Sequence, residues 1–188
     1  LCPRPPGRER HGIADLARFL ERLLGLGARH LHAGEQLPRE LSLYVAEGRQ
    51  TIAPSFALVR AGGPASSEAS AEDTPASVAG RAYQMLVWDL GEAGRGLPLD
   101  KPETITGAWD YPPAAKFDRL LRHCRVPIGL LTNREQVRLV YAPHGESSGA
   151  ITFRIDDMLA TAGRPILDAF VALLEQRRLF VLAEDRRL

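Results

Sequence analysis

Two carboxylates, Asp89 and Glu92, lie at the end of an apolar segment that is the clearest strand candidate in the chain. Segment 83–90 (YQMLVWDL) is almost entirely apolar, which is typical of a central strand buried on both faces. Carboxylates at a strand end can hold Mg²⁺, which activates water and neutralises a scissile phosphate. The alternative is that Asp89 only makes a turn hydrogen bond. Asp89 and Glu92 are therefore the candidate catalytic residues, and no complete set of metal ligands accompanies them.

Arginines form the second group with binding chemistry. Only two of the 24 basic residues are lysines, Lys101 and Lys116. Arginine suits bidentate contacts with phosphate and guanine, although coding bias in a GC-rich genome would give the same composition. Three arginines recur at i, i+3, i+6 spacing opposite an apolar helix stripe, and two lie in a predicted hairpin. The DNA-binding candidates are Arg119, Arg122, Arg125, Arg134 and Arg138. A solvated polar face is the alternative interpretation.

Two motif-like segments lack the context that their chemistry needs. The segment 145–149 (GESSG) matches the nucleophile elbow of serine hydrolases, but it leads toward another strand, and the last histidine, His144, precedes it. The segment 110–113 (DYPP) has the wrong order for the base-holding motif of adenine methyltransferases. We therefore predict a connecting loop for the first and a helix-entry turn for the second, and no S-adenosylmethionine site in this chain.

Composition limits the remaining possibilities. The 188 residues are enough for one sizeable core, and the net charge of +1 provides no global attraction to nucleic acid. Cys2 and Cys124 form neither a disulfide framework nor a metal pattern, so a reducing cytoplasm is the expected location. No signal peptide and no apolar run of membrane-spanning length is visible, which predicts no membrane association.

Periodicity predicts an α/β protein. Apolar residues at helical spacing predict helices over 13–26, 114–125 and 164–174, and a shorter helix is expected over 156–160. Strands are expected over 55–59 and 83–90, in a hairpin around the turn 132–135, and over 151–153. The small, polar segment 62–80 is predicted to be a mobile loop.

The segment 127–153 carries a resemblance. It contains PIGLLTN, RLVYAP and GESSG, and this pattern resembles the end of the nuclease-like N-terminal region of bacterial type II (IIG/IIL-like) restriction–modification or phage-defence DNA adenine methyltransferases. The resemblance implies a restriction-endonuclease-like (PD-(D/E)XK-type) core, a mixed sheet flanked by helices. That family places Pro-Asp on one strand and Asp/Glu-x-Lys on the next. Here the first pair is Pro54-Ser55 and the triplet is Asp89-Leu90-Gly91, so the catalytic motif is degenerate.

The resemblance also predicts the organisation of the chain. Residues 1–11 would be a flexible stub, 12–160 the nuclease-like domain, and 161–188 a helical segment leading to a methyltransferase domain that this chain lacks. S-adenosylmethionine would bind in that missing part, and Mg²⁺ would bind here only if the nuclease site were active. The chain itself would hold no cofactor.

Three functions remain open from the sequence. The first is a non-catalytic, nuclease-derived module that grips double-stranded DNA or other restriction or defence subunits. The second is a working Mg²⁺-dependent endonuclease that uses Asp89 and Glu92. The third is a protein-interaction domain that docks a partner through the apolar faces of its last helices and makes no DNA contact.

Overall fold

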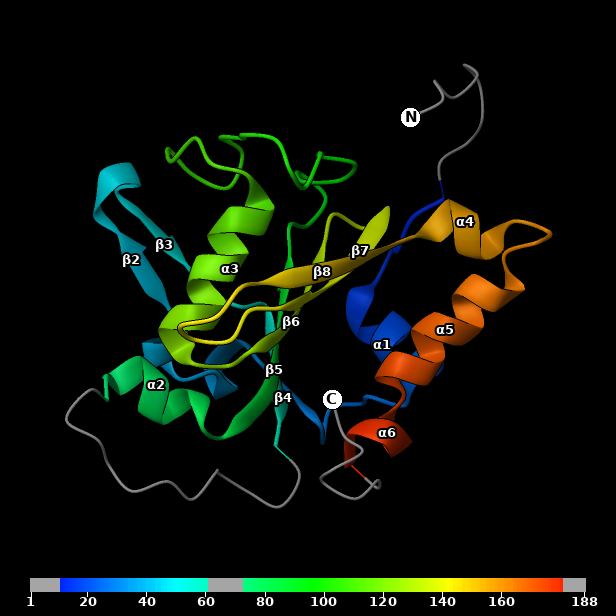
Figure 1. The fold of residues 1–188 in the computed structure, drawn as a ribbon, viewed down its shortest axis with the longest axis horizontal. Coiled ribbons are helices and arrows are strands. Elements are labelled where there is room, and N and C mark those ends of the chain that lie inside the picture. The colour runs from blue at the N-terminus through cyan, green and yellow to red at the C-terminus, as the bar shows by residue number, and fades with distance from the viewer. Residues whose placement is uncertain (1–10, 61–72, 181–188) are drawn as a thin grey trace.

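A six-stranded mixed sheet forms the centre of the molecule in the computed structural model, which describes residues 11–60 and 73–180 (Figure 1). The strand order is β1-β4-β5-β6-β7-β8, and neighbouring strands are antiparallel except the parallel pair β5 and β6. The strands are β1 (Leu31–Ala33), β4 (Phe56–Val59), β5 (Tyr83–Asp89), β6 (Ile128–Thr132), β7 (Gln136–Tyr141) and β8 (Gly149–Arg154).

Helices cover both faces of this sheet (Figure 1). One face carries α3 (Pro113–Cys124), which connects β5 to β6 because parallel neighbours require a crossover. The other face carries α1 (Leu16–Leu24), α4 (Ile155–Leu159) and α5 (Arg164–Leu174). The predicted α/β class, with a mixed sheet flanked by helices, is confirmed. The remaining elements are α2 (Pro75–Gly80), α6 (Gln176–Phe180), a separate hairpin of β2 (Leu43–Val45) and β3 (Gln50–Ile52), and short 3₁₀ turns at Gly34–Gln36, Arg39–Leu41 and Ala46–Gly48.

Strand β5 supplies side chains to two apolar cores, one on each side of the sheet. Leu86 and Trp88 pack into the core under α3, whereas Met85 and Val87 pack into the core under α1 and α5. This alternation follows from the two-residue period of a strand and explains the nearly unbroken apolar run in the sequence.

Local sequence signals fix the ends of the main helices. Asp15 caps α1 by accepting the N–H of Arg18 at 3.0 Å, and Gly25 ends it with φ 73°. Both features fit the preferences of helix caps. Pro112 caps α3 and Pro113 occupies its first turn, which confirms the helix-entry turn predicted for 110–113.

The loop predicted over 62–80 extends too far toward the C-terminus. It is wrong at its end, because α2 forms at Pro75–Gly80 behind a capping box between Thr74 and Ser77. Residues 61–72 lie outside the described residues, as do 1–10 of the predicted stub. Phe170 and Leu174 of α5 are fully buried in the same core as Leu20 of α1. Within the described ranges, no helix has the length and apolar character needed to cross a bilayer.

Candidate functional site

The sheet topology brings Ser55 and Asp89 together where β4 begins and β5 ends. We call this end of the central strands the strand edge. Strands β4 and β5 are antiparallel, so the start of β4 lies beside the end of β5, with Phe56 opposite Val87. The Ser55 hydroxyl accepts the backbone N–H of Asp89 at 3.0 Å. Because β6 runs parallel to β5, its end also reaches this edge, where Thr132 pairs with Asp89. Residues that follow β6 therefore meet the candidate carboxylates.

The guanidinium of Arg134 joins both candidate carboxylates. Its Nε and Nη2 donate to Asp89, with Nη2 lying 2.9 Å from Oδ2, and its Nη1 donates to Oε1 of Glu92 at 2.5 Å. The Asp89 side chain is only 11% exposed and that of Arg134 17%, whereas Glu92 is 62% exposed. We call Ser55, Asp89, Glu92 and Arg134 the Arg134 cluster. Arg134, which follows β6, contacts the carboxylate at the end of β5, and Ser55 at the start of β4 contacts the backbone of Asp89.

A rigid turn positions Arg134. The buried Asn133 accepts the N–H groups of Glu135 and Gln136 through Oδ1 and donates through Nδ2 to the carbonyl of Leu97 at 2.6 Å. Thr132 Oγ1 accepts the N–H of Arg134, which has φ 66°. A non-glycine residue in this left-handed region needs such support from its surroundings. The turn therefore fixes the direction in which the guanidinium points.

Hydrogen bonds in the cluster favour the charged forms of Arg134 and Glu92. The hydrogen bonds with Asp89, ahead of those with Glu92, raise the pKa of Arg134. The hydrogen bond from Arg134 is the main cause that lowers the pKa of Glu92, followed by the bond from Arg95. Because Arg95 also pairs with Glu92, two guanidinium groups balance the two carboxylates at this site.

These residues do not fit a Mg²⁺ ion. Both oxygens of Asp89 accept from Arg134, and Oδ1 also accepts the N–H of Gly91 at 2.9 Å. Ser55 directs its hydroxyl to the backbone of Asp89, where the nuclease pattern has a second carboxylate. Across residues 11–60 and 73–180, no three His, Cys, Asp or Glu side chains gather as a possible metal site. The turn hydrogen bond that the sequence suggested for Asp89 is present.

The three candidate DNA-binding arginines at the end of α3 each contact an acidic residue. Arg119 lies 3.8 Å from Glu47 and over the ring of Trp109. Arg122 pairs with Asp118 at 2.8 Å and also donates to the carbonyl of Pro143. Arg125 pairs with Asp73 at 3.4 Å. Their side chains remain between 28% and 46% exposed, so solvent still reaches each guanidinium.

The two hairpin candidates lie elsewhere. Arg134 belongs to the cluster above, and Arg138 forms a bidentate pair with Asp100 and donates to Thr152 of β8 at 2.8 Å. Arg138 and Asp118 both line a groove of about 390 Å³ between α3 and the start of β8. Arg138 therefore shares a groove with Asp118, the partner of Arg122, whereas Arg134 lies with the carboxylates.

A buried ion pair escaped the sequence analysis. Lys116 of α3 is fully buried, and its Nζ donates to Glu103 Oε1 at 2.7 Å and to Thr106 Oγ1 at 3.1 Å. Trp109 lies over the same ammonium, 5.9 Å from ring centroid to Nζ. The pair attaches the long connection between β5 and α3 to the α3 helix. The rarity of lysine in this chain was the available signal.

The segment 145–149 leads into β8 rather than into a helix, which removes the context of a nucleophile elbow. Comparisons with protein-family models, with curated proteins and with solved structures found no match for this chain.

Proposed function

We propose that this domain is a non-catalytic, nuclease-derived module of a DNA restriction–modification or phage-defence methyltransferase, and that it binds DNA or a partner subunit. The observation that carries the proposal is the Arg134 guanidinium, which holds Asp89 and Glu92 where a nuclease would need free carboxylates. The family assignment rests on the resemblance in 127–153. Methylation with S-adenosylmethionine would then belong to a domain C-terminal to this one.

The arrangement of strands supports a nuclease ancestry. Ser55 and Asp89 occupy the facing ends of adjacent antiparallel strands, β4 and β5, and α3 leads from β5 to the parallel strand β6. The restriction-endonuclease-like core implied by the resemblance uses this order of elements. Fold alone does not determine activity, so the argument against catalysis comes from the residues at the edge.

The positions of the lysines argue against cleavage. A nuclease of this type uses a lysine two residues after the second acidic residue, but Gly91 occupies that position. Lys116 is buried against Glu103 and Thr106 and cannot assist an attacking water at the strand edge. The edge therefore offers compensated charges and hydrogen-bonding groups but no activated nucleophile.

Salt-dependent DNA binding tests whether the domain binds DNA. Fluorescence anisotropy of a labelled mixed-sequence duplex would be measured at 50 and 200 mM NaCl. If the three α3 arginines exchange their carboxylates for phosphates, affinity should fall by about 40-fold over this range, as expected for about three released counterions. The variant Arg119→Gln/Arg122→Gln/Arg125→Gln should lose most of this salt dependence. The control Arg164→Gln/Arg177→Gln/Arg178→Gln removes the same charge from α5 and α6 and should retain it.

Cleavage of supercoiled plasmid with Mg²⁺ or Mn²⁺ tests whether the domain is non-catalytic. We expect no metal-dependent nicking by the intact chain. Nicking that disappears in Asp89→Ala would replace the proposal with the active-endonuclease alternative. If neither cleavage nor salt-sensitive binding occurs, the partner-docking role is the part of the proposal that stands.

A further inference from the structure

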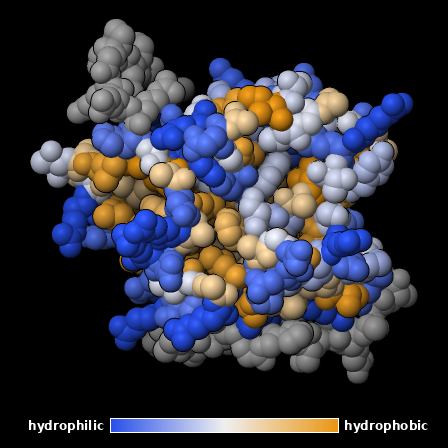
Figure 2. Space-filling model, turned by 180° about the vertical axis from the view of Figure 1, so that it is seen from behind, coloured by the Kyte–Doolittle hydropathy of each residue, from blue (hydrophilic) through white to orange (hydrophobic). Residues whose placement is uncertain are grey.

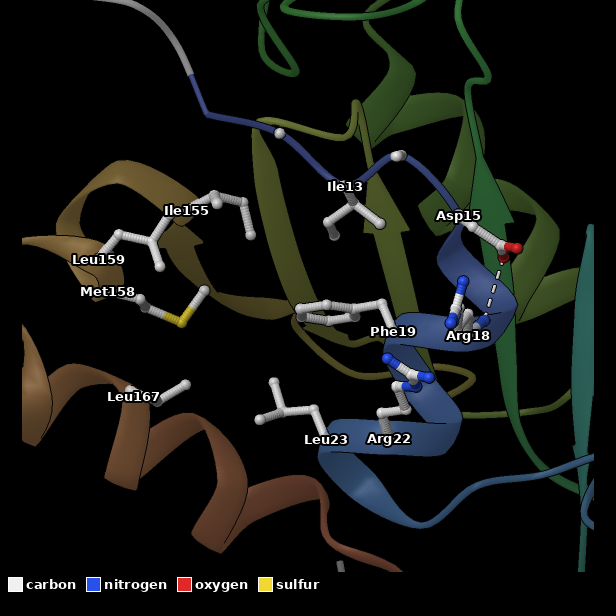
Figure 3. A pocket seen from close by; sticks show the side chains of 12 residues that line it. Ile13, Asp15, Arg18, Phe19, Arg22, Leu23, Ile155, Met158, Leu159 and Leu167 are labelled. Carbon is white, nitrogen blue, oxygen red and sulfur yellow. Dashed lines mark hydrogen bonds between the residues drawn. The ribbon is translucent and has the colours of Figure 1, made fainter.

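An apolar pocket of about 460 Å³ opens between α1 and the pair α4 and α5 (Figure 3). Phe19 and Leu23 of α1 point across it toward α4 and α5. Met158 and Leu159 of α4 and Leu167 of α5 form the opposite wall (Figure 3). The volume falls within the range of small-molecule sites.

The pocket walls are apolar groups that the fold leaves incompletely covered. Leu159 is 62% exposed, and Phe19, Leu23 and Leu167 are only partly buried against the core beneath them. Seen from behind, apolar side chains also reach the surface on the side where α4 and α5 lie (Figure 2). An apolar ligand body placed here would remove these side chains from water, which is favourable in proportion to the area covered.

The α1 wall adds positive charge to the pocket. Arg18 and Arg22 are one helical turn apart and lie beside Phe19 (Figure 3). Within the described ranges, neither guanidinium has an ion-pair or hydrogen-bond partner, in contrast to all five candidate DNA-binding arginines. Asp15 also lines the pocket, but its carboxylate caps α1. The pocket lining therefore carries two guanidinium groups without a partner among the described residues, and one carboxylate that is used to cap α1.

We propose that this pocket binds a small organic acid with an aliphatic or aromatic body, whose carboxylate pairs with Arg18 and Arg22. The body would fill the space between Phe19, Leu23 and Met158, and the anion would remain at the open side. This binding is independent of the proposed nuclease ancestry and of any DNA contact.

The two methionines of the chain provide a direct test. Met158 lines the pocket, whereas Met85 lies on β5 and is buried in the core. With ¹³C-methyl-methionine labelling of the full chain, sodium decanoate should shift the Met158 resonance saturably and leave Met85 nearly unchanged. The neutral analogue 1-decanol should bind more weakly.

Charge variants separate anion recognition from simple apolar binding. Arg18→Gln/Arg22→Gln should weaken decanoate binding by about 5-fold, the worth of exposed guanidinium–carboxylate contacts, and leave decanol binding unchanged. The control Arg29→Gln/Arg39→Gln removes equal charge outside the pocket and should keep the affinity for decanoate. Leu23→Trp, checked for folding by circular dichroism, should fill the pocket and abolish both.

Three results would overturn the proposal. One is an unchanged Met158 resonance with decanoate. Another is equal affinity for decanoate and decanol together with no effect of Arg18→Gln/Arg22→Gln. The third is a Met158 shift that appears on concentrating the protein alone, because a second copy of the chain would then occupy the pocket.

Discussion

The Arg134 cluster and the buried pair of Lys116 and Glu103 use similar contacts in different surroundings. Lys116 and Glu103 have almost no exposed side-chain surface, whereas Glu92 in the cluster is largely exposed and Arg134 partly so. Removing one partner from the buried pair leaves a charge without water or a counterion. In the cluster, water can hydrate the exposed Glu92 and so replace part of the hydrogen bonding that a substitution removes. We therefore expect the buried pair to maintain the fold and the cluster to tolerate substitution without loss of the fold.

The largest effect should follow from breaking the buried pair. We expect Lys116→Met to lower the free energy of unfolding by about 3–5 kcal/mol, because Glu103 remains buried without its cation. Urea denaturation followed by tryptophan fluorescence would measure it. The chain offers a matched control in its other lysine, since Lys101 is exposed. Lys101→Met should change stability by less than about 0.5 kcal/mol. Equal effects of the two substitutions would contradict the distinction.

A smaller effect is expected from the cluster. Arg134→Gln should lower the free energy of unfolding by about 1–2 kcal/mol, because charged hydrogen bonds to the poorly exposed Asp89 are lost while Glu92 regains water. Arg95→Gln is the control, since Glu92 is the only acidic partner of Arg95 among the described residues, at 3.4 Å. An exposed pair of this kind contributes at most about 1 kcal/mol. A loss in Arg134→Gln as large as that in Lys116→Met would mean that the cluster also maintains the fold.

Lowering the pH should reduce the difference in the free energy of unfolding between the wild type and Lys116→Met. Burial opposes ionisation of Glu103, but hydrogen bonds from Lys116 and Thr106 outweigh it and lower the pKa of Glu103. A lowered folded-state pKa contributes stability that is present at neutral pH and is lost as the pH falls through that pKa. In Lys116→Met the pKa of the buried carboxyl should rise instead. The stability difference should therefore shrink by roughly 1 kcal/mol between about pH 7 and pH 3.5. A constant difference in urea titrations at both pH values would assign the effect to packing.

The weakest expected effect is a gain of metal binding at the strand edge. Ser55→Asp/Arg134→Gln places a new carboxylate beside Asp89 and removes the guanidinium from it. We expect Mn²⁺ binding on the order of millimolar affinity, the range of weak carboxylate sites, measured by electron paramagnetic resonance of free Mn²⁺. The matched control Ser55→Asn/Arg134→Gln lacks the new charge and should not bind. Binding by the unaltered chain would show that Arg134 does not exclude the ion.

Elements with long, regular patterns could be predicted from the sequence. The apolar run of β5 and the leucine spacing of α1 gave these elements within a few residues of their observed ends. Strand β1 was missed because Leu31–Ala33 is too short to show a period. The helix α2 was absorbed into a loop, although Thr74 before Pro75 is a helix-start signal.

The site was only half predictable. Asp89 and Glu92 could be found because they end a recognisable strand. Their pairing with Arg134 could not, because 45 residues separate Asp89 from Arg134 and only the parallel arrangement of β5 and β6 brings them together. The partners of Lys116 were hidden for a different reason. A lysine in an amphipathic helix is expected to face water, so no buried partner was sought for it.

Asn133 links the hairpin turn to the connection that follows β5. Its buried amide joins the hairpin turn to the carbonyl of Leu97, and its own carbonyl accepts the N–H of Gly96. The turn and the connection after β5 therefore cannot separate one hydrogen bond at a time. Amide protons in such a cooperative unit exchange only through a larger opening of the structure. The edge should keep its shape through the nanosecond fluctuations of ordinary loops and present a fixed pattern of charge to an approaching molecule.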